Sequence, residues 1–224
     1  MTKTKKITTI GMLSAVAYLF TLIGHFIPIS FTDFLRYDPK DAIIVLAGLS
    51  IGPVSAFVIS VIVAFLELVT ISTTGLIGFA MNIISSAAFA CIASLVYAKF
   101  KSIRGAVAGL VLSSAATVIL MLLWNYLVTP LYMGVPREAV ASMLVPVFLP
   151  FNVIKCCLNS ALVMLIYKPC VQAMRRVGLM GRARAVKEEN DAPQKKQYSP
   201  HPISVLISIW VIAVMIALFV TLKN

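Results

Sequence analysis

Charged side chains are scarce in this chain of 224 residues. Asp, Glu, Lys and Arg make up only 12% of it, whereas 60% of its residues are hydrophobic. Soluble domains are about a quarter charged and roughly half apolar. This composition excludes a large soluble domain and predicts an all-α integral membrane protein. At about 20 residues for each span, six or seven helices would use most of the chain.

The sequence also lacks the motifs of common catalytic and nucleotide-binding sites. It contains no G-x-x-x-x-G-K-[ST] run, no H-E-x-x-H and no G-x-S-x-G. The 4 cysteines show no C-x-x-C spacing and lie in or beside apolar runs, so we interpret them as small apolar side chains. We therefore expect no enzymatic activity, no metal site and no cofactor.

Apolar runs predict where the chain crosses the membrane. Full spans are expected at 7–27, 53–71, 76–97, 106–128 and 146–169. The run 42–51 is too short to span, and a short helix is expected after Pro136. The predicted organisation is a six-helix membrane domain at 1–176, a polar linker at 177–202 and an appended seventh transmembrane helix at 203–222.

Positive charge gathers at alternate ends of these runs. The net charge is +11, and a nucleic acid is the usual partner of so basic a protein. With the N-terminus inside, however, 14 Lys and Arg residues fall in inner segments and only Arg36, Lys40, Arg137 and Lys223 in outer ones. The positive-inside rule accounts for this asymmetry without nucleic acid, and it predicts a multi-pass protein with a cytoplasmic N-terminus.

Lys155 is the one base that this scheme places deep within a span. It lies on the same helical face as Asn152 and Asn159, at spacings of three and four residues. An intramembrane lysine costs roughly 2.5–3.5 kcal/mol on insertion scales and by default marks a site. The alternatives are a lysine that extends to the membrane surface or one that pairs with an acid.

Two further features suggest contacts outside the apolar core. The loop 28–41 mixes charged and aromatic residues and could cap a cavity, or it could anchor the chain at the interface. Gly11 and Ala15 are small residues four apart, which would let another helix approach closely, unless their spacing is accidental. Glu67 is the only acid expected inside a span, where it could be interfacial or face a cavity.

Several of these stretches resemble the riboflavin-specific substrate-binding subunits of bacterial energy-coupling factor (ECF) transporters. The resemblance covers about residues 7–170. It is carried by the loop sequence DFLRYDPKD at 33–41, by LAG and GP at 46–53, by MNIIS at 81–85, by WNY at 124–126 and by PFNVIK at 150–155.

The resemblance implies a six-helix subunit that captures riboflavin from outside the cell for ATP-driven import. Its implied partners are a transmembrane coupling protein and two ATPase subunits. Flavin contacts are implied for Asn125, Asn152 and Lys155, with Asn82 as a further candidate from the same motifs. Leu35 and Tyr37 would cover the ring, and Gly11 and Ala15 would face the coupling protein. The linker and the seventh helix depart from the usual six-helix pattern.

Other functions remain open at this point. The chain could carry another vitamin or a precursor, act alone as a proton-coupled carrier, or be a small membrane enzyme. The scarcity of intramembrane acids disfavours the last two, since both proton transfer and metal-dependent chemistry require ionisable ligands.

Overall fold

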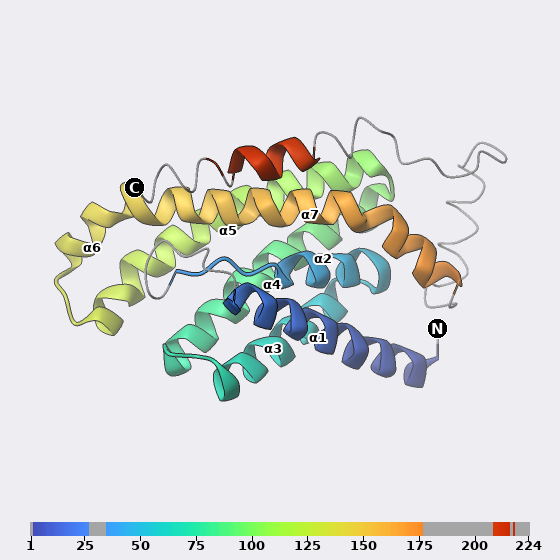
Figure 1. The fold of residues 1–224 in the computed structure, drawn as a ribbon, viewed down its shortest axis with the longest axis horizontal. Coiled ribbons are helices and arrows are strands. Elements are labelled where there is room, and N and C mark those ends of the chain that lie inside the picture. Colours follow the sequence, from blue (N-terminus) through green and yellow to red (C-terminus); the bar gives the residue numbers. More distant parts are fainter. Residues whose placement is uncertain (1, 27–34, 177–207, 216, 218–224) are drawn as a thin grey trace.

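The computed structural model describes residues 2–26, 35–176, 208–215 and 217. Every long element in this part of the chain is a helix, and the helices pack into one bundle in which α1, α3, α4 and α5 are inclined to α7 (Figure 1). In chain order they are α1 (Lys3–Phe26), α2 (Lys40–Ile51), α3 (Pro53–Thr70), α4 (Gly75–Phe100), α5 (Ile103–Met133), α6 (Arg137–Met143), the π-helical turn η1 (Leu144–Phe148) and α7 (Leu149–Arg176).

Five of the described helical stretches are long and apolar enough to cross a membrane. They correspond to α1, α3, α4, α5 and the continuous run from α6 to α7, which confirms the prediction of a multi-pass all-α protein. Helix α2, with 12 residues, is too short to span. The sequence predicted this short element.

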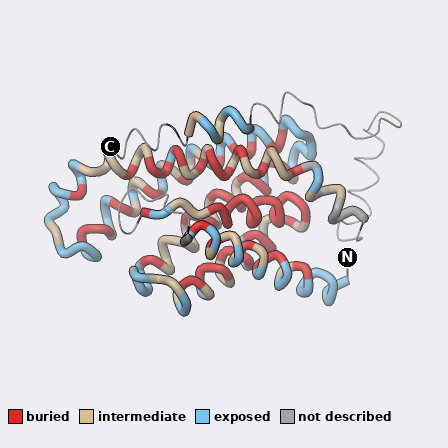
Figure 2. The backbone as a smooth tube through the Cα atoms, viewed as in Figure 1, coloured by how far each residue is buried: buried red, intermediate tan, exposed pale blue. Residues whose placement is uncertain are grey.

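Helix α2 forms the centre of the bundle. It packs against α1, α3, α4 and α7, and all its residues from Lys40 to Ser50 are buried (Figure 2). A helix that is apolar on every side belongs inside a protein, because no face of it gains from contact with water. In a bilayer the same surroundings leave it no lipid-facing side.

The start of α2 corrects one interpretation of the sequence. The sequence places Lys40 and Asp41 in an outer loop and leaves Lys155 as the only base deep within a predicted span. Lys40 and Asp41 instead form the first turn of α2, where they are only 1% and 2% exposed. The helix begins directly after Pro39, so both residues belong to α2. Because α2 packs against α1, α3, α4 and α7, both charged side chains are enclosed by neighbouring helices.

Close backbone contacts fix α4 against its neighbours. A Cβ atom added to Gly48 of α2 would lie 2.9 Å from the Cβ atom of Ser94 in α4, and one added to Gly109 of α5 would lie 2.8 Å from the carbonyl oxygen of Ala93. Such short distances are tolerated only without a side chain. These two glycines therefore let α2 and α5 pack tightly against the same turn of α4, at Ser94 and Ala93.

The helix ends differ in detail from the sequence prediction. The short helix after Pro136 is present as α6, but α7 does not begin afresh at Pro146. That proline lies within η1, which joins α6 to α7 in one helical run. Helix α5 also continues past the predicted end at 128 and contains Pro130 in its last turns.

The C-terminal part is described only in pieces. Residues 208–215 and 217 are helical and run alongside α5 and α7 (Figure 1). Ser208 and Val211 share an apolar cavity of about 360 Å³ with residues of both helices. The predicted linker 177–202 and the remainder of the predicted seventh helix lie outside the described residues.

Candidate functional site

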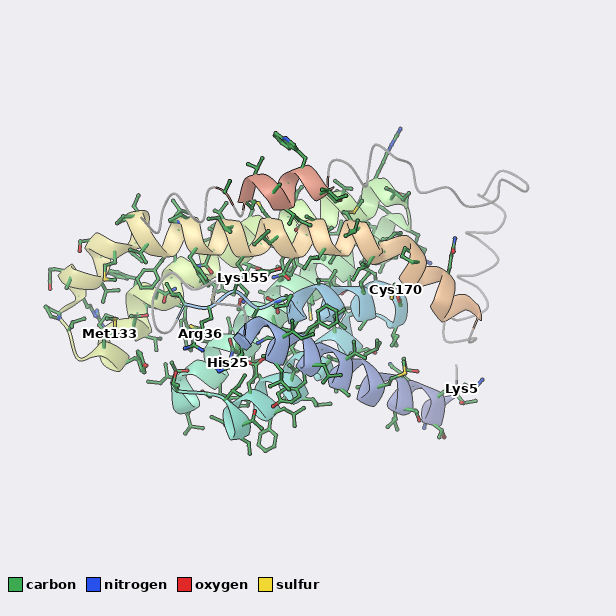
Figure 3. The ribbon with its side chains drawn as sticks, viewed as in Figure 1. Lys5, His25, Arg36, Met133, Lys155 and Cys170 are labelled. Atoms are coloured by element: carbon green, nitrogen blue, oxygen red, sulfur yellow. The ribbon has the colours of Figure 1, made fainter. Side chains whose placement is uncertain are left out.

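A cavity of about 140 Å³ lies where the end of α1, the segment 35–38, the turn from α3 to α4 and the first two turns of α7 meet. Four of the predicted site residues line it: Leu35, Tyr37, Asn82 and Lys155. Figure 3 shows Lys155 partway along α7, well away from both Met133 and Lys5 near opposite ends of the molecule. The sequence prediction thus brought together residues that are up to 120 positions apart.

One side of the cavity is built on Lys40. Its ammonium nitrogen lies 2.6 Å from Oδ2 of Asp38 and also forms an ion pair with Oε1 of Glu67. Glu67 and Asp38 both line the cavity, whereas Lys40 lies behind them. The ion pairs therefore join the first turn of α2 to the end of α3 and to the segment before α2.

Glu67 is held from two further directions. Its Oε1 accepts a hydrogen bond from the Thr21 hydroxyl of α1 at 3.1 Å. Its Oε2 accepts from the Asn82 side-chain amide of α4 at 2.7 Å. Asn82, a predicted ligand contact, is in this way oriented by a buried carboxylate, which leaves its amide oxygen and its second N–H for other contacts.

The other side of the cavity is built on Asp41. Its Oδ2 lies 3.1 Å from the Lys155 ammonium, and its Oδ1 accepts a hydrogen bond from the hydroxyl of Ser86 in α4. The Asp41 side chain is 3% exposed, and that of Lys155 is 11% exposed. Of the two alternatives to a ligand-binding lysine, pairing with an acid is therefore observed. The same ammonium still borders the cavity.

These contacts form two groups of charges, Lys40 with Asp38 and Glu67 and Lys155 with Asp41, which adjoin because Lys40 and Asp41 are consecutive in α2; together they are called the network below. Removing one member of such a network leaves an uncompensated charge in a poorly solvated place, which typically costs about 3–5 kcal/mol. The network spans α2, α3 and α7 and reaches α1 and α4 through hydrogen bonds. Its geometry depends on the whole bundle.

The segment 35–38 covers the cavity and is fastened at both ends. Leu35 is 3% exposed and packs in a small apolar cluster with Val140, Phe148 and Phe151. Tyr37 donates a long hydrogen bond of 3.5 Å to Oδ1 of Asn159, whose amide donates to the carbonyl oxygen of Asp38 at 3.2 Å. Asn159 thus ties the cover to α7.

Two side chains at the rim add charge and hydrogen-bonding capacity. The Arg36 guanidinium lies 3.1 Å from Nδ1 of His25 at the end of α1, and Figure 3 shows the two side by side.

Burial raises the pKa of Tyr37 above its ordinary value, and the nearby carboxylates of Asp38 and Asp41 raise it further. The Tyr37 hydroxyl therefore stays a neutral donor.

The structure does not bring all the predicted contacts to this cavity. Asn125 lines a neighbouring cavity of about 20 Å³, which shares Thr74 and Met81 with the first. Its amide donates to the carbonyl oxygen of Met121, four residues earlier. Asn152 lines neither cavity and likewise donates to its own helix, at the carbonyl oxygen of Phe148.

Lys40, Asp38 and Asp41 are the site-forming residues that sequence reasoning missed. A signal was present, because two charged residues directly precede a run of apolar residues that shows no polar face. A helix without a polar face is enclosed, so charges in its first turn must find partners inside the protein. Apart from Asp38, the partners of Lys40 and Asp41 lie 27 or more positions away and could not be identified from spacing.

The predicted docking residues Gly11 and Ala15 are both exposed on α1. A Cβ atom added at Gly11 would meet nothing within 4 Å. This face of α1 is therefore unoccupied by the described part of the chain, as a surface for another helix requires.

Comparisons with known proteins agree on one family. Residues 5–167 match the model of the substrate-specific component of ECF transporters. The chain is 29% identical to the riboflavin transporter FmnP of Bacillus subtilis (strain 168) over 185 residues, which cover 77% of this chain and 97% of that protein. It is 27% identical to the riboflavin transporter RibU of Staphylococcus aureus (strain TCH60) over 183 residues, which cover 79% and 96% of the two chains.

A solved structure is similar as well. It is that of the S component of a bacterial ECF transporter, with a TM-score of 0.66 and 26% sequence identity, and it matches 77% of this chain and 99% of that one. The family model ends at residue 167, so the C-terminal helical segment lies beyond the part that defines the family.

Proposed function

The chain belongs to the substrate-specific components of ECF transporters, and from that premise we propose that it captures riboflavin in the cavity beneath segment 35–38. The two curated relatives are named as riboflavin transporters. The observation that carries the proposal is the convergence of Lys155, Asn82, Tyr37 and Leu35 on one cavity. They combine hydrogen-bonding groups with an apolar cover, which suits a flat ring with polar edges.

Lys155 has donors left for a ligand in spite of its ion pair. An ammonium group carries three N–H bonds, and Asp41 accounts for one of them. A remaining N–H can donate to a carbonyl oxygen of the flavin ring. The two interpretations of Lys155, an ion-paired lysine and a ligand-binding lysine, are therefore compatible.

Binding also requires the cover to move. Small-molecule pockets usually measure roughly 300–1,000 Å³, whereas this cavity measures about 140 Å³. Of the polar contacts that hold segment 35–38, the hydrogen bond from Tyr37 is among the longest, at 3.5 Å. Outward movement of this segment would enlarge the cavity toward the side from which the vitamin enters.

The energy for release would come from partner subunits. Emptying a mostly occupied site takes about 5.5 kcal/mol of differential binding, and the sequence has no phosphate-binding loop. Glu67 is a poor proton carrier here, because Lys40, Thr21 and Asn82 already engage its carboxylate. A coupling protein and two ATPases therefore fit the proposal, with the N-terminus of this chain in the cytoplasm.

The test is quenching of riboflavin fluorescence by the purified protein in detergent. Lys155→Met should weaken binding by about tenfold or more, since a hydrogen bond from a charged donor contributes about 1.5–3 kcal/mol. Lys155→Met alone leaves the Asp41 carboxylate buried without its partner. The double variant Lys155→Met/Asp41→Asn removes that unpaired charge and is the matched control. Unchanged affinity in both variants, or no quenching by the wild type, would contradict the proposal.

A further inference from the structure

Asp41 touches the ligand-facing lysine but not the cavity. Its side chain is 3% exposed, and it is not among the residues that line either cavity at this end of the bundle. Each of its carboxylate oxygens has one partner: the hydroxyl of Ser86 at Oδ1 and the Lys155 ammonium at Oδ2. The carboxylate is thus fixed from α4 and directed at α7.

A lysine without such a partner would not remain a defined donor. Its side chain has four flexible carbons and readily extends toward water, and burial without a counter-charge disfavours the ammonium form. Asp41 opposes both tendencies, because it offers a carboxylate within 3.1 Å of the Lys155 nitrogen. Ser86 in turn prevents that carboxylate from rotating.

We propose that Asp41 is the positioning residue of the vitamin site: it keeps Lys155 charged and directs its free N–H bonds into the cavity. This role rests on the proposed function of Lys155 as a flavin contact. Asp41 itself does not touch the vitamin. It acts through Lys155, and Ser86 supports it from behind.

The need to attach α2 to its neighbours does not explain the ion pair between Asp41 and Lys155. The first turn of α2 is already joined to α3 by the ion pair of Lys40 with Glu67, and Gly48 packs α2 closely against α4. Well-packed apolar residues hold two helices together as well as a buried ion pair does or better. An ion pair between α2 and α7 is needed where a charged lysine must stay at the cavity wall.

The experiment is a double-mutant cycle on riboflavin affinity, using wild type, Asp41→Asn, Lys155→Met and the double variant. Asp41→Asn should weaken binding about tenfold while Lys155 is present, which is the effect of one charged hydrogen bond. In the Lys155→Met background the same substitution should change affinity less than about twofold, because coupled residues are not additive. Glu138→Gln removes an exposed carboxylate on α6 and is the matched control for loss of one acid.

A spectroscopic measurement separates positioning from a merely structural role. An ammonium donor weakens the C=O bond of the ring to which it donates, so the carbonyl infrared band of bound riboflavin should lie at lower frequency in the wild type than in Lys155→Met. In Asp41→Asn the band should move to the position seen in Lys155→Met. A structural role would lower affinity but leave the band of the bound vitamin unchanged.

The outcomes distinguish this inference from the proposed function. If the wild type binds riboflavin, and Asp41→Asn has the same effect in both backgrounds with an unmoved band, the positioning role is wrong and the vitamin site stands. If the wild type does not bind riboflavin, both proposals fail. Should Asp41→Asn not fold, Ser86→Ala takes its place and should shift the band in the same direction by a smaller amount, and no shift there overturns the role.

Discussion

Helices α1 and α2 are both apolar, yet they have opposite positions in the molecule. Helix α1 has 24 residues and exposes large side chains such as Ile7, Met12 and Leu19. Helix α2 has half that length and is buried from Lys40 to Ser50. In a bilayer both lipid and protein interior are apolar, so hydrophobicity alone does not say which helix is central.

The two helices also satisfy their polar groups in different ways. In α1 the hydroxyls of Thr9 and Ser14 donate to carbonyl oxygens four residues earlier in the same helix. In α2 the charged side chains of Lys40 and Asp41 depend on partners from α3, α4 and α7. Helix α1 therefore satisfies several of its hydroxyls by itself, reaches α3 through Thr21, and has a free face, whereas the charges of α2 require partners from three other helices.

The largest effect should follow from breaking the network at its centre. Lys40→Met leaves Asp38 and Glu67 without their shared base, and we expect a loss of about 3–5 kcal/mol in the free energy of unfolding. Unfolding in detergent, followed by circular dichroism against denaturant, would measure it. Lys5→Met on exposed α1 is the matched control and should change stability by less than about 0.5 kcal/mol.

A second variant tests the cause of that loss. Lys40→Met/Glu67→Gln removes one of the two stranded charges and should recover part of the stability, even though it carries one more substitution. If the double variant has a lower free energy of unfolding than Lys40→Met, the ion pair is not what holds the start of α2.

Alanine substitution of one glycine in each helix should give effects of opposite sign. Gly48→Ala places a Cβ atom 2.9 Å from Ser94 Cβ and 3.1 Å from Ala56 Cβ, and overpacking of this kind costs about 1–3 kcal/mol. Gly11→Ala meets nothing within 4 Å and should stabilise α1 by about 0.5–1 kcal/mol. Thermal unfolding of the two variants side by side measures both. Equal shifts would show that α2 is not packed more tightly than α1.

The same contrast explains what could be predicted from the sequence. Helix positions followed from apolar runs, and the short α2 and α6 were found because length and proline placement are local signals. Asn82 and Lys155, which were predicted as ligand contacts, both line the cavity, and their contact with a ligand stays a prediction. The partners of Lys40 and Asp41 were not found, because they depend on which helices become neighbours.

Asn125 and Asn152 show a second limit. The family resemblance implies that both contact the flavin, and this stays a prediction, although neither lines the cavity that contains Lys155. In the structure each donates to the carbonyl oxygen four residues earlier. A side-chain amide can satisfy a donor on its own helix, so a polar residue within a span does not by itself identify a shared site. The rotation of α5 and α7 about their axes decides which amide faces the cavity.

The smallest loss of stability should come from adding bulk to the free face of α1. Gly11 and Ala15 are exposed and lie one helical turn apart, so Gly11→Leu has room and, like Gly11→Ala, should lower neither stability nor riboflavin affinity. If this face contacts the coupling protein through a close helix crossing, the added side chain separates the helices, and the variant should no longer co-purify with that protein. Met12→Phe adds bulk to an exposed position about 100° around the same helix and should still co-purify. If Gly11→Leu still co-purifies, the docking surface lies elsewhere. If the variant loses both riboflavin binding and co-purification, the substitution disturbs the fold, and α1 depends on the bundle more than its hydrogen bonds suggest.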